Sequence, residues 1–297
     1  MSDLSGAVVL ALVAAVGWSL FDLERRLLSA RVEAMALVAW VTLGALPPLA
    51  IWAALSGASG PQGVLQAEPG YWLPAISSVV INLVANFTYF RALQLSPLSK
   101  TLPMLSFTPA FAAVLAALFL GERLGLRAVA GLLLVVCGAL LLTLREGSGL
   151  RGFFSGLLED RGCRLMVGVA LLWSATLLLD KQALAAGSPH LHALVLNGGV
   201  ALGALSVLGV RGDLRTLGGL RGSGWLLMLA VATGAVALGS QLVALGEVPV
   251  GFLETVKRGV GGVLAVVWGR TLFSEPVTAA KFAAVGLMTV GVALVVL

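Results

Sequence analysis

The chain has 297 residues, of which 59% are hydrophobic and 11% are charged, and its mean hydropathy is +1.02. A soluble domain has about 45–50% apolar residues, so this composition excludes an ordinary soluble fold and favours a membrane protein. The formal net charge of +5 comes from basic residues that flank apolar stretches, which indicates contact with a membrane surface, and we expect no nucleic-acid partner.

Apolar stretches follow one another along nearly the whole chain. About 18 residues with few charges can cross a bilayer as a helix, because a helix satisfies its own backbone polar groups. The first stretch has no basic leader and no cleavage site, so we predict a retained helix there. This criterion predicts ten spans, with the lipid bilayer as partner, over residues 4–21, 34–55, 71–93, 98–120, 126–144, 165–179, 191–210, 225–245, 249–273 and 277–297.

Several features recur about 153 residues apart, which indicates an internal repeat. The chain is therefore predicted to contain two five-helix repeats, over residues 1–145 and 164–297. Because five is odd, the second repeat must be inverted, with a central cavity between the two. The junction, residues 146–163, is predicted to be an amphipathic segment on the membrane surface. The recurring pairs are Trp72 and Trp225, Glu122 and Glu275, and Gly138 and Gly291.

The basic residues predict an orientation in the cell (inner) membrane. Fourteen Lys and Arg residues follow odd-numbered spans, whereas three follow even-numbered spans. Basic links favour the cytoplasmic side, so this bias places both termini outside.

The stretch "SPLSKTLPMLSFTPAFAAVLAALFLGERLGLRAVAGLLLVVCGALLL", residues 96–142, resembles the end of an EamA-type repeat of the drug/metabolite transporter superfamily. The second copy, "VKRGVGGVLAVVWGRTLFSEPVTAAKFAAVGLMTVGVAL", is similar, with Ser274 where glycine is usual. The resemblance covers nearly the whole chain. It implies a secondary transporter, commonly an exporter, built from two inverted five-helix repeats around a central cavity. It also implies cytoplasmic termini and a basic second link, whereas "SGASGPQGVLQAEPG" contains no Lys or Arg.

Three charged residues stand in the ninth span, in "GFLETVKRGVGG". Each charge near a helix centre costs roughly 2.5–3.5 kcal/mol on insertion scales. Glu254 is spaced to face Lys257 at i+3 and Arg258 at i+4, but one carboxylate neutralises only one cation. We therefore predict that these residues line the substrate path, with Glu254 as the proton-coupling candidate. The alternative is a structural ion pair. The Lys-Arg dipeptide also resembles one that binds phosphate in the triose-phosphate and nucleotide-sugar branch.

Other polar or aromatic residues within spans are candidates for substrate contact. An amide in hydrocarbon needs a partner, which is either the substrate or another helix. The tryptophans either line an aromatic cavity or pack. These further candidates are Asn82, Asn86, Tyr89, Gln241, Trp18 and Trp173.

The remaining polar residues have modest interpretations. We expect Glu122 and Glu275 to cap the helices that follow them. Glu24 and Asp180 are expected at span ends, as solvated groups or gate salt bridges. His190 and His192 form an H-x-H pair without an evident third ligand, so we expect an interfacial loop and no metal.

The function predicted from the sequence is a secondary active transporter, an exporter of a small polar metabolite such as an amino acid or organic anion, by alternating access. No cofactor motif is evident, and a monomer or a dimer is expected. The alternatives are an exchanger of phosphate-bearing metabolites and a polytopic membrane enzyme. An enzyme would need acid, base or metal-binding groups gathered at one interface, but the short links offer scattered single residues. We therefore expect that the protein is not an enzyme.

Overall fold

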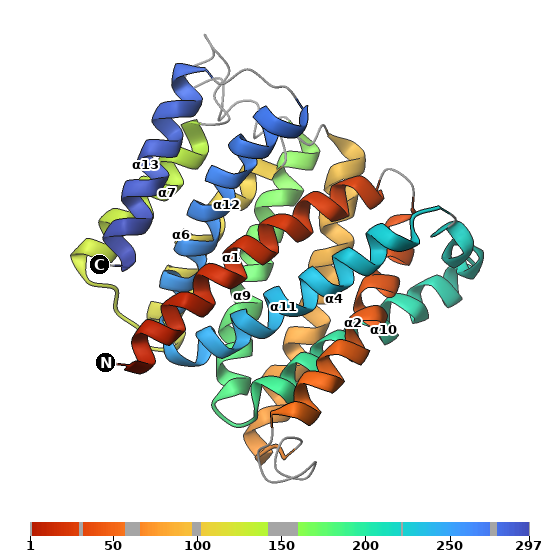
Figure 1. Cartoon of the computed structure of the whole chain (residues 1–297). Coiled ribbons are helices and arrows are strands. Elements are labelled where there is room, and N and C mark those ends of the chain that lie inside the picture. The colour runs from red at the N-terminus through yellow and green to blue at the C-terminus, as the bar shows by residue number, and fades with distance from the viewer. Residues whose placement is uncertain are drawn as a thin grey trace. The chain divides into compact units, whose positions relative to one another are not determined.

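The computed structural model describes residues 2–29, 32–56, 66–96, 102–141, 160–220, 222–273 and 278–296. These residues form helices (Figure 1). Within the same ranges there is no strand, and the β-type pairing consists of an isolated bridge between Ala67 and Gly187. The predicted all-α fold class is confirmed.

Each predicted span contains an α-helix in the described ranges. Predicted span 34–55 and the observed α2 have the same bounds. The fourth span is divided into a 3₁₀-helix, η2 (Leu102–Phe107), and a shorter α-helix that has Pro109 in its first turn. The α-helices are α1 (Ser2–Ser29), α2 (Ala34–Leu55), α4 (Trp72–Leu95), α6 (Thr108–Phe119), α7 (Leu126–Leu141), α9 (Arg161–Leu184), α10 (Pro189–Arg211), α11 (Gly224–Glu247), α12 (Val250–Phe273) and α13 (Ala279–Val296).

Seven helical segments in the described part of the chain are long and apolar enough to cross a membrane: Ser5–Ser29, Ala34–Leu55, Pro69–Tyr89, Arg161–Leu184, Pro189–Arg211, Gly224–Glu247 and Ala279–Val296. The apolar segments Met104–Phe119 and Leu126–Leu141 are shorter. Helix α12 has 24 residues, but its four charged residues are spread so that every 18-residue segment contains at least three of them. The chain is therefore a multi-pass membrane protein, while ten crossings remain a prediction.

The chain divides into two compact units, each drawn from both halves of the sequence. Unit 1 comprises Met1–Phe87 and Thr176–Glu247, and unit 2 comprises Thr88–Ala175 and Val248–Leu297. Helices α4 and α9 each contribute residues to both units. The predicted repeat boundaries concern the sequence and stay a prediction. Most of the predicted surface segment, including Phe153 and Phe154, lies outside the described residues.

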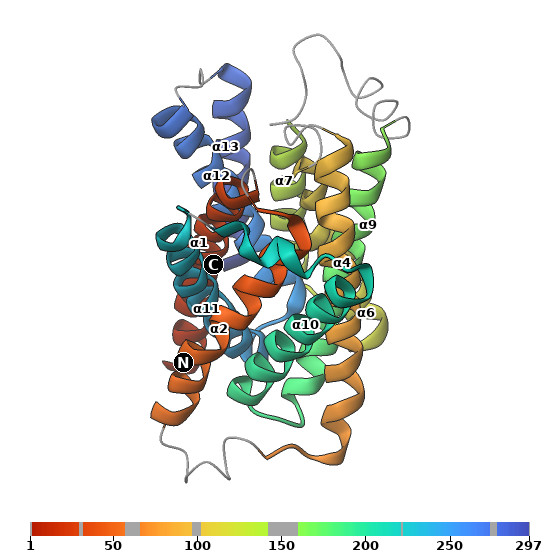
Figure 2. The ribbon, with the colours of Figure 1, turned by 90° about the vertical axis from the view of Figure 1, so that its right-hand side faces the viewer.

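Small residues allow close helix packing in unit 1. Helix α1 lies along α11 (Figure 1), and α2 packs against α10 (Figure 2). A Cβ added at Gly17 of α1 would lie 2.9 Å from the Cβ of Ala237 on α11. On α10, Gly199 and Gly203 face Val79 and Leu83 of α4 in the same way. Each glycine thus admits a neighbouring side chain that a larger residue would displace.

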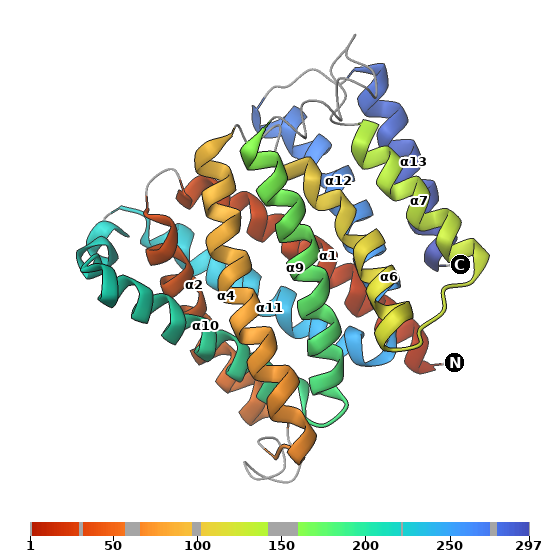
Figure 3. The ribbon, with the colours of Figure 1, turned by 180° about the vertical axis from the view of Figure 1, so that it is seen from behind.

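In unit 2, α7 packs along α13 (Figure 3). The contact is close because two glycines face each other. A Cβ at Gly131 would lie 2.5 Å from the carbonyl oxygen of Gly291, and one at Gly291 would lie 2.6 Å from that of Gly131. Helix α12 contacts α6, α7 and α13. Its Gly251 faces Ala113 and its Gly259 faces Val292. These glycines of α12 therefore serve helix packing.

The Gly-Glu-Arg motif after α6 has a structural explanation. Gly121 has φ +66°, a left-handed conformation in which glycine ends a helix without strain. The carboxylate of Glu122 then accepts a hydrogen bond from the backbone N–H of Val250, at 2.9 Å. Glu122 thus caps the N-terminus of α12, a helix of the other sequence repeat, where we expected it to cap the next helix. The corresponding Glu275 lies outside the described residues.

Candidate functional site

The predicted charged cluster on α12 is present and largely buried. The Glu254 side chain is 1% exposed, and its Oε1 accepts a hydrogen bond from Nζ of Lys257. Its Oε2 lies 3.7 Å from Nε of Arg258, which is an ion-pair distance and too long for a hydrogen bond. The side chains of Lys257 and Arg258 are 12% and 22% exposed. Two cations therefore share one buried carboxylate.

The cluster has an incomplete set of hydrogen bonds. Within the part of the chain that the structure describes, both Glu254 Oε2 and Arg258 Nε are buried without a hydrogen-bond partner. A buried guanidinium N–H without an acceptor is costly, and a guanidinium binds a carboxylate or phosphate through several N–H groups at once. The Arg258 guanidinium therefore has hydrogen-bonding capacity for one further anionic group.

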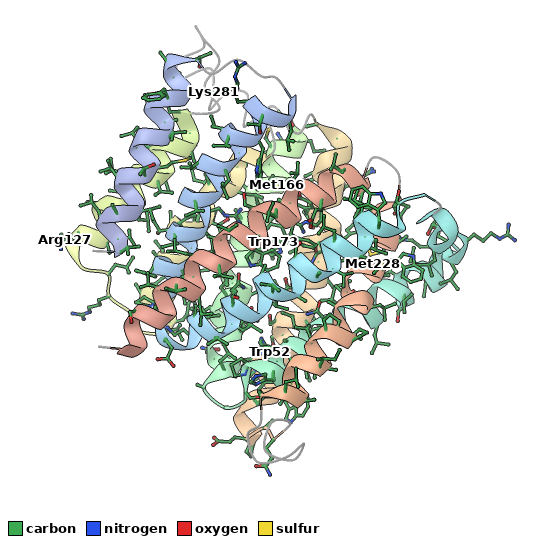
Figure 4. The ribbon with its side chains drawn as sticks, viewed as in Figure 1. Trp52, Arg127, Met166, Trp173, Met228 and Lys281 are labelled. Atoms are coloured by element: carbon green, nitrogen blue, oxygen red, sulfur yellow. The ribbon has the colours of Figure 1, made fainter. Side chains whose placement is uncertain are left out.

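Two predicted aromatic residues lie together in unit 2, which also contains the charged cluster. The rings of Tyr89 on α4 and Trp173 on α9 have centroids 5.4 Å apart. Tyr89 is buried and Trp173, labelled in Figure 4, is half-buried. The third aromatic candidate, Trp18, belongs to unit 1 and packs edge-on against Phe21, with centroids 5.6 Å apart. A contact between these rings and a substrate stays a prediction.

Two of the predicted amide residues, Asn82 and Asn86, use a side-chain donor within their own helix. Nδ2 of Asn82 donates to Oγ of Ser78 at 3.3 Å, and Nδ2 of Asn86 donates to the carbonyl oxygen of Asn82 at 2.8 Å. Gln241 is a buried residue of α11. These contacts favour a structural role for the two asparagines, while substrate contact by any of the three stays a prediction.

Unit 1 contains a buried polar network that the sequence analysis missed. Asp180 on α9 is 3% exposed, and its Oδ1 accepts a hydrogen bond from Oγ of Ser78. Nε2 of His192 lies 3.0 Å from the same Oδ1. On the other side of the ring, Nδ1 of His192 lies 3.3 Å from the hydroxyl of Tyr71. Ser78, His192 and Tyr71 are fully buried. The network therefore joins a carboxylate, an imidazole and a phenol out of contact with solvent.

This network corrects two expectations. His192 lies within α10 and is buried, so the interfacial-loop prediction is wrong for it. Asp180 is buried because α9 continues to Leu184, beyond the predicted end of the span. The signal that could have placed His192 is Ser188-Pro189, since serine is a favoured N-cap and proline a favoured first helical residue. The Ser188 hydroxyl indeed accepts from the Leu191 backbone N–H.

A second buried acid occupies a related position. Glu24 on α1 is 5% exposed, and its Oε1 accepts a hydrogen bond from Oγ1 of Thr233 on α11, at 3.2 Å. For both Asp180 and Glu24, the acid lies on the first helix of one sequence repeat, α9 or α1. The hydroxyl comes from the third helix of the other repeat, α4 or α11. Glu24 was also expected at a span end, but α1 continues to Ser29. Glu254 is therefore one of several buried acids among the described residues.

Comparisons with known proteins identify the family and the fold. The chain matches the EamA-like transporter family twice, over residues 5–144 and over residues 160–297. No curated protein matches it by sequence. One solved crystal structure has 21% sequence identity and a TM-score of 0.75, covering 98% of this chain and 96% of that chain. At this level of identity, the structural match establishes the fold alone.

Proposed function

Because the chain belongs to the EamA-like transporter family of the drug/metabolite transporter superfamily, we propose that it is a secondary active transporter whose substrate carries a carboxylate. The substrate class is an amino acid or another small organic anion, and the direction is export. Transport proceeds by alternating access, in which the two repeats expose a midplane site to one side of the membrane and then to the other.

The surplus positive charge on α12 is the observation that carries this proposal. Glu254 neutralises one of the two cations beside it, so the cluster of Glu254, Lys257 and Arg258 has a net charge of +1. Hydrocarbon tolerates such a surplus poorly, and intramembrane charges therefore pair with one another or line a substrate path. A carboxylate bound at Arg258 would neutralise the surplus and supply the missing hydrogen-bond acceptor.

The same charge count separates the two substrate classes. A phosphate ester carries close to two negative charges at neutral pH. It would be neutralised only if both cations were available, but Lys257 already donates to Glu254. A single carboxylate matches the surplus of one. The pairing observed on α12 therefore favours an amino acid or organic acid over a phosphate-bearing metabolite.

The proposal includes the architecture predicted from the sequence. It takes ten crossings as two inverted five-helix repeats, residues 1–145 and 164–297, around a central cavity. The family match over two segments of similar bounds supports this arrangement. The proposed location is the inner membrane, with both termini outside, the orientation that the distribution of basic residues predicts.

The test measures uptake into vesicles that contain purified protein. A panel of labelled L-amino acids and organic acids is offered to wild type, Lys257→Gln and Arg258→Gln. Both substitutions remove one positive charge and bring the cluster to neutrality, so we expect both variants to lose most of the flux of any acid that wild type transports. Sugar phosphates in the same panel test the alternative substrate class.

A matched control comes from the same helix. Arg270 lies in the last turn of α12 and is exposed. Arg270→Gln removes an equal charge away from the cluster and is expected to keep wild-type flux. Wild-type flux in both Lys257→Gln and Arg258→Gln would refute a substrate role for the cluster. A preference of wild type for sugar phosphates would refute the carboxylate assignment.

A further inference from the structure

The buried network of unit 1 has the composition of a proton-binding site. The Asp180 carboxylate, when ionised, can only accept hydrogen bonds. The proton between Oδ1 of Asp180 and Nε2 of His192 therefore belongs to His192. It follows that Nδ1 of a neutral His192 carries no proton and accepts a hydrogen bond from the Tyr71 hydroxyl. In this state the network has a net charge of −1.

One added proton can enter with the number of hydrogen bonds in the network unchanged, because the contact between Tyr71 and His192 reverses its direction. If it binds Nδ1 of His192, the imidazolium donates to the oxygen of Tyr71 through Nδ1 and to Asp180 through Nε2. The Tyr71 hydroxyl only has to rotate. The network then holds an imidazolium beside a carboxylate, and its net charge is zero. Because burial penalises a net charge strongly, neutrality favours the protonated state.

Other polar, charged and titratable groups stand on the elements around the network. From α4, Ser78 donates to Asp180, and Asn82 donates to Ser78. From α9, Lys181 follows Asp180 and is half-buried. From α10, His190 packs against Trp52 of α2, which is labelled in Figure 4, with ring centroids 4.1 Å apart. Two acids at the ends of neighbouring elements are exposed, namely Glu68 before η1 (Pro69–Tyr71) and Glu247 at the end of α11.

Glu254 is less suited to the same task. It is paired with Lys257 and lies near Arg258, and two adjacent cations stabilise its ionised form. A proton on Glu254 would also raise the net charge of that cluster to +2. Glu254 is the proton-coupling candidate predicted from the sequence, but its contacts favour a different location.

We propose that Asp180 and His192, together with Tyr71, form a proton-binding site of this protein, and that its proton is the coupling ion of the transport proposed above. Only the claim that this proton is the coupling ion rests on the proposed function. The network joins η1, α4, α9 and α10, so binding of the proton changes hydrogen bonds shared by all four elements. A gain or loss of charge there alters how tightly these helices are held together.

Proton binding is tested without any substrate. The chain has two histidines, so His190→Asn in protein without a histidine tag leaves His192 as the sole imidazole. Nitrogen-15 histidine labelling and long-range proton–nitrogen correlation then report its tautomer between pH about 5 and about 9. We expect the Nε2–H tautomer at high pH and proton uptake on Nδ1 as the pH falls. Absence of titration over this range would overturn the proposal.

Variants assign the titration to the network. Asp180→Asn removes the adjacent negative charge that holds the imidazolium, and we expect the measured midpoint of His192 to change. Tyr71→Phe keeps the packed ring and removes the hydrogen-bond partner of Nδ1 in both protonation states, so it should also move the midpoint, and it serves where Asp180→Asn fails to fold. Glu24→Gln, which removes a buried acid of the same unit, should leave the midpoint unchanged. An unchanged midpoint in both Asp180→Asn and Tyr71→Phe would contradict the assignment of the titration to this network.

Coupling is tested in vesicles with the same panel of amino acids and organic acids. For each protein, we compare accumulation under an imposed proton gradient with counterflow in its absence. In wild type, we expect the ratio of accumulation under the gradient to counterflow without it to exceed about ten. In His192→Gln it should fall to about one. A ratio in His192→Gln equal to that of wild type would overturn coupling at this site. Absence of all flux in wild type would refute the proposed function, and the titration of His192 would still decide whether the proton site exists.

Discussion

The charge of the α12 cluster can be changed one unit at a time, and binding of an anionic substrate should follow it. Lys257→Gln leaves Arg258 opposite Glu254, with no surplus. The double variant Glu254→Gln/Lys257→Gln removes one charge of each sign and restores a surplus of +1 on Arg258. We therefore expect the single variant to lose binding and the double variant to regain it.

The expected magnitude follows from the geometry. A unit charge about 4 Å from a bound carboxylate contributes about 4 kcal/mol at an effective dielectric constant of about 20. Because Lys257 and Arg258 are 12% and 22% exposed, solvent screens part of this interaction. We expect a loss of ~2–4 kcal/mol in Lys257→Gln, which is ~30- to ~1000-fold in dissociation constant. The double variant should recover at least about tenfold of that loss.

The assay is ligand binding to purified protein. The ligand is the amino acid or organic acid that raises the melting temperature of wild type most in a thermal-shift panel, since a bound ligand stabilises the folded state by mass action. Size-exclusion chromatography establishes that each variant is folded. If the double variant binds no better than Lys257→Gln, then the surplus charge does not determine binding and the reasoning from charge count fails.

Three further predictions concern the fold. Gly291→Ala places a methyl group against the carbonyl oxygen of Gly131 and should lower stability by about 1–3 kcal/mol in thermal unfolding, whereas Gly286→Ala on the same helix meets open space and should not. Hydrogen bonds from Ser96 and the Cys163 N–H hold the pKa of Asp160 below its ordinary value. The stability that these bonds contribute is present above the unfolded pKa of about 3.9 and is lost as the pH falls through the folded pKa. The difference in melting temperature between wild type and Asp160→Asn should therefore disappear in acid. Alkaline phosphatase fused after residue 297 should be active if the C-terminus is outside, and a fluorescent protein that folds only in the cytoplasm should be the active fusion if it is not.

The features that the sequence predicted best are local ones. The bounds of α2 were correct because the apolar stretch and the helix coincide, and in the structure Glu33 caps the helix by accepting from the Ala36 N–H at 2.9 Å. The pairing of Glu254 with Lys257 and Arg258 was also predicted, since residues three and four apart on a helix are neighbours whatever the tertiary structure. The charge surplus that supports the proposed function is thus readable from the sequence.

The features that the sequence did not predict depend on partners far along the chain. Glu24 and Asp180 were taken to mark the ends of spans, because an unpaired acid has no place in hydrocarbon. Their helices continue because hydroxyl groups reach them from Thr233, 209 residues away, and from Ser78, 102 residues away. The burial of His192 likewise depends on Tyr71, 121 residues away. No spacing rule connects such pairs, so only the folded chain reveals them.

The interleaving of the two units constrains how the protein can be made. When the ribosome has completed the first half of the sequence, α1 has entered the membrane but α11, along which it packs, has not been synthesised. The glycine-lined surface of α7 must likewise wait for α13, which lies in the second half of the sequence. Neither half of the sequence can therefore complete its folding alone. Nascent chains must keep these polar and glycine-rich surfaces protected in the translocon or the lipid until α11 and α13 have been synthesised.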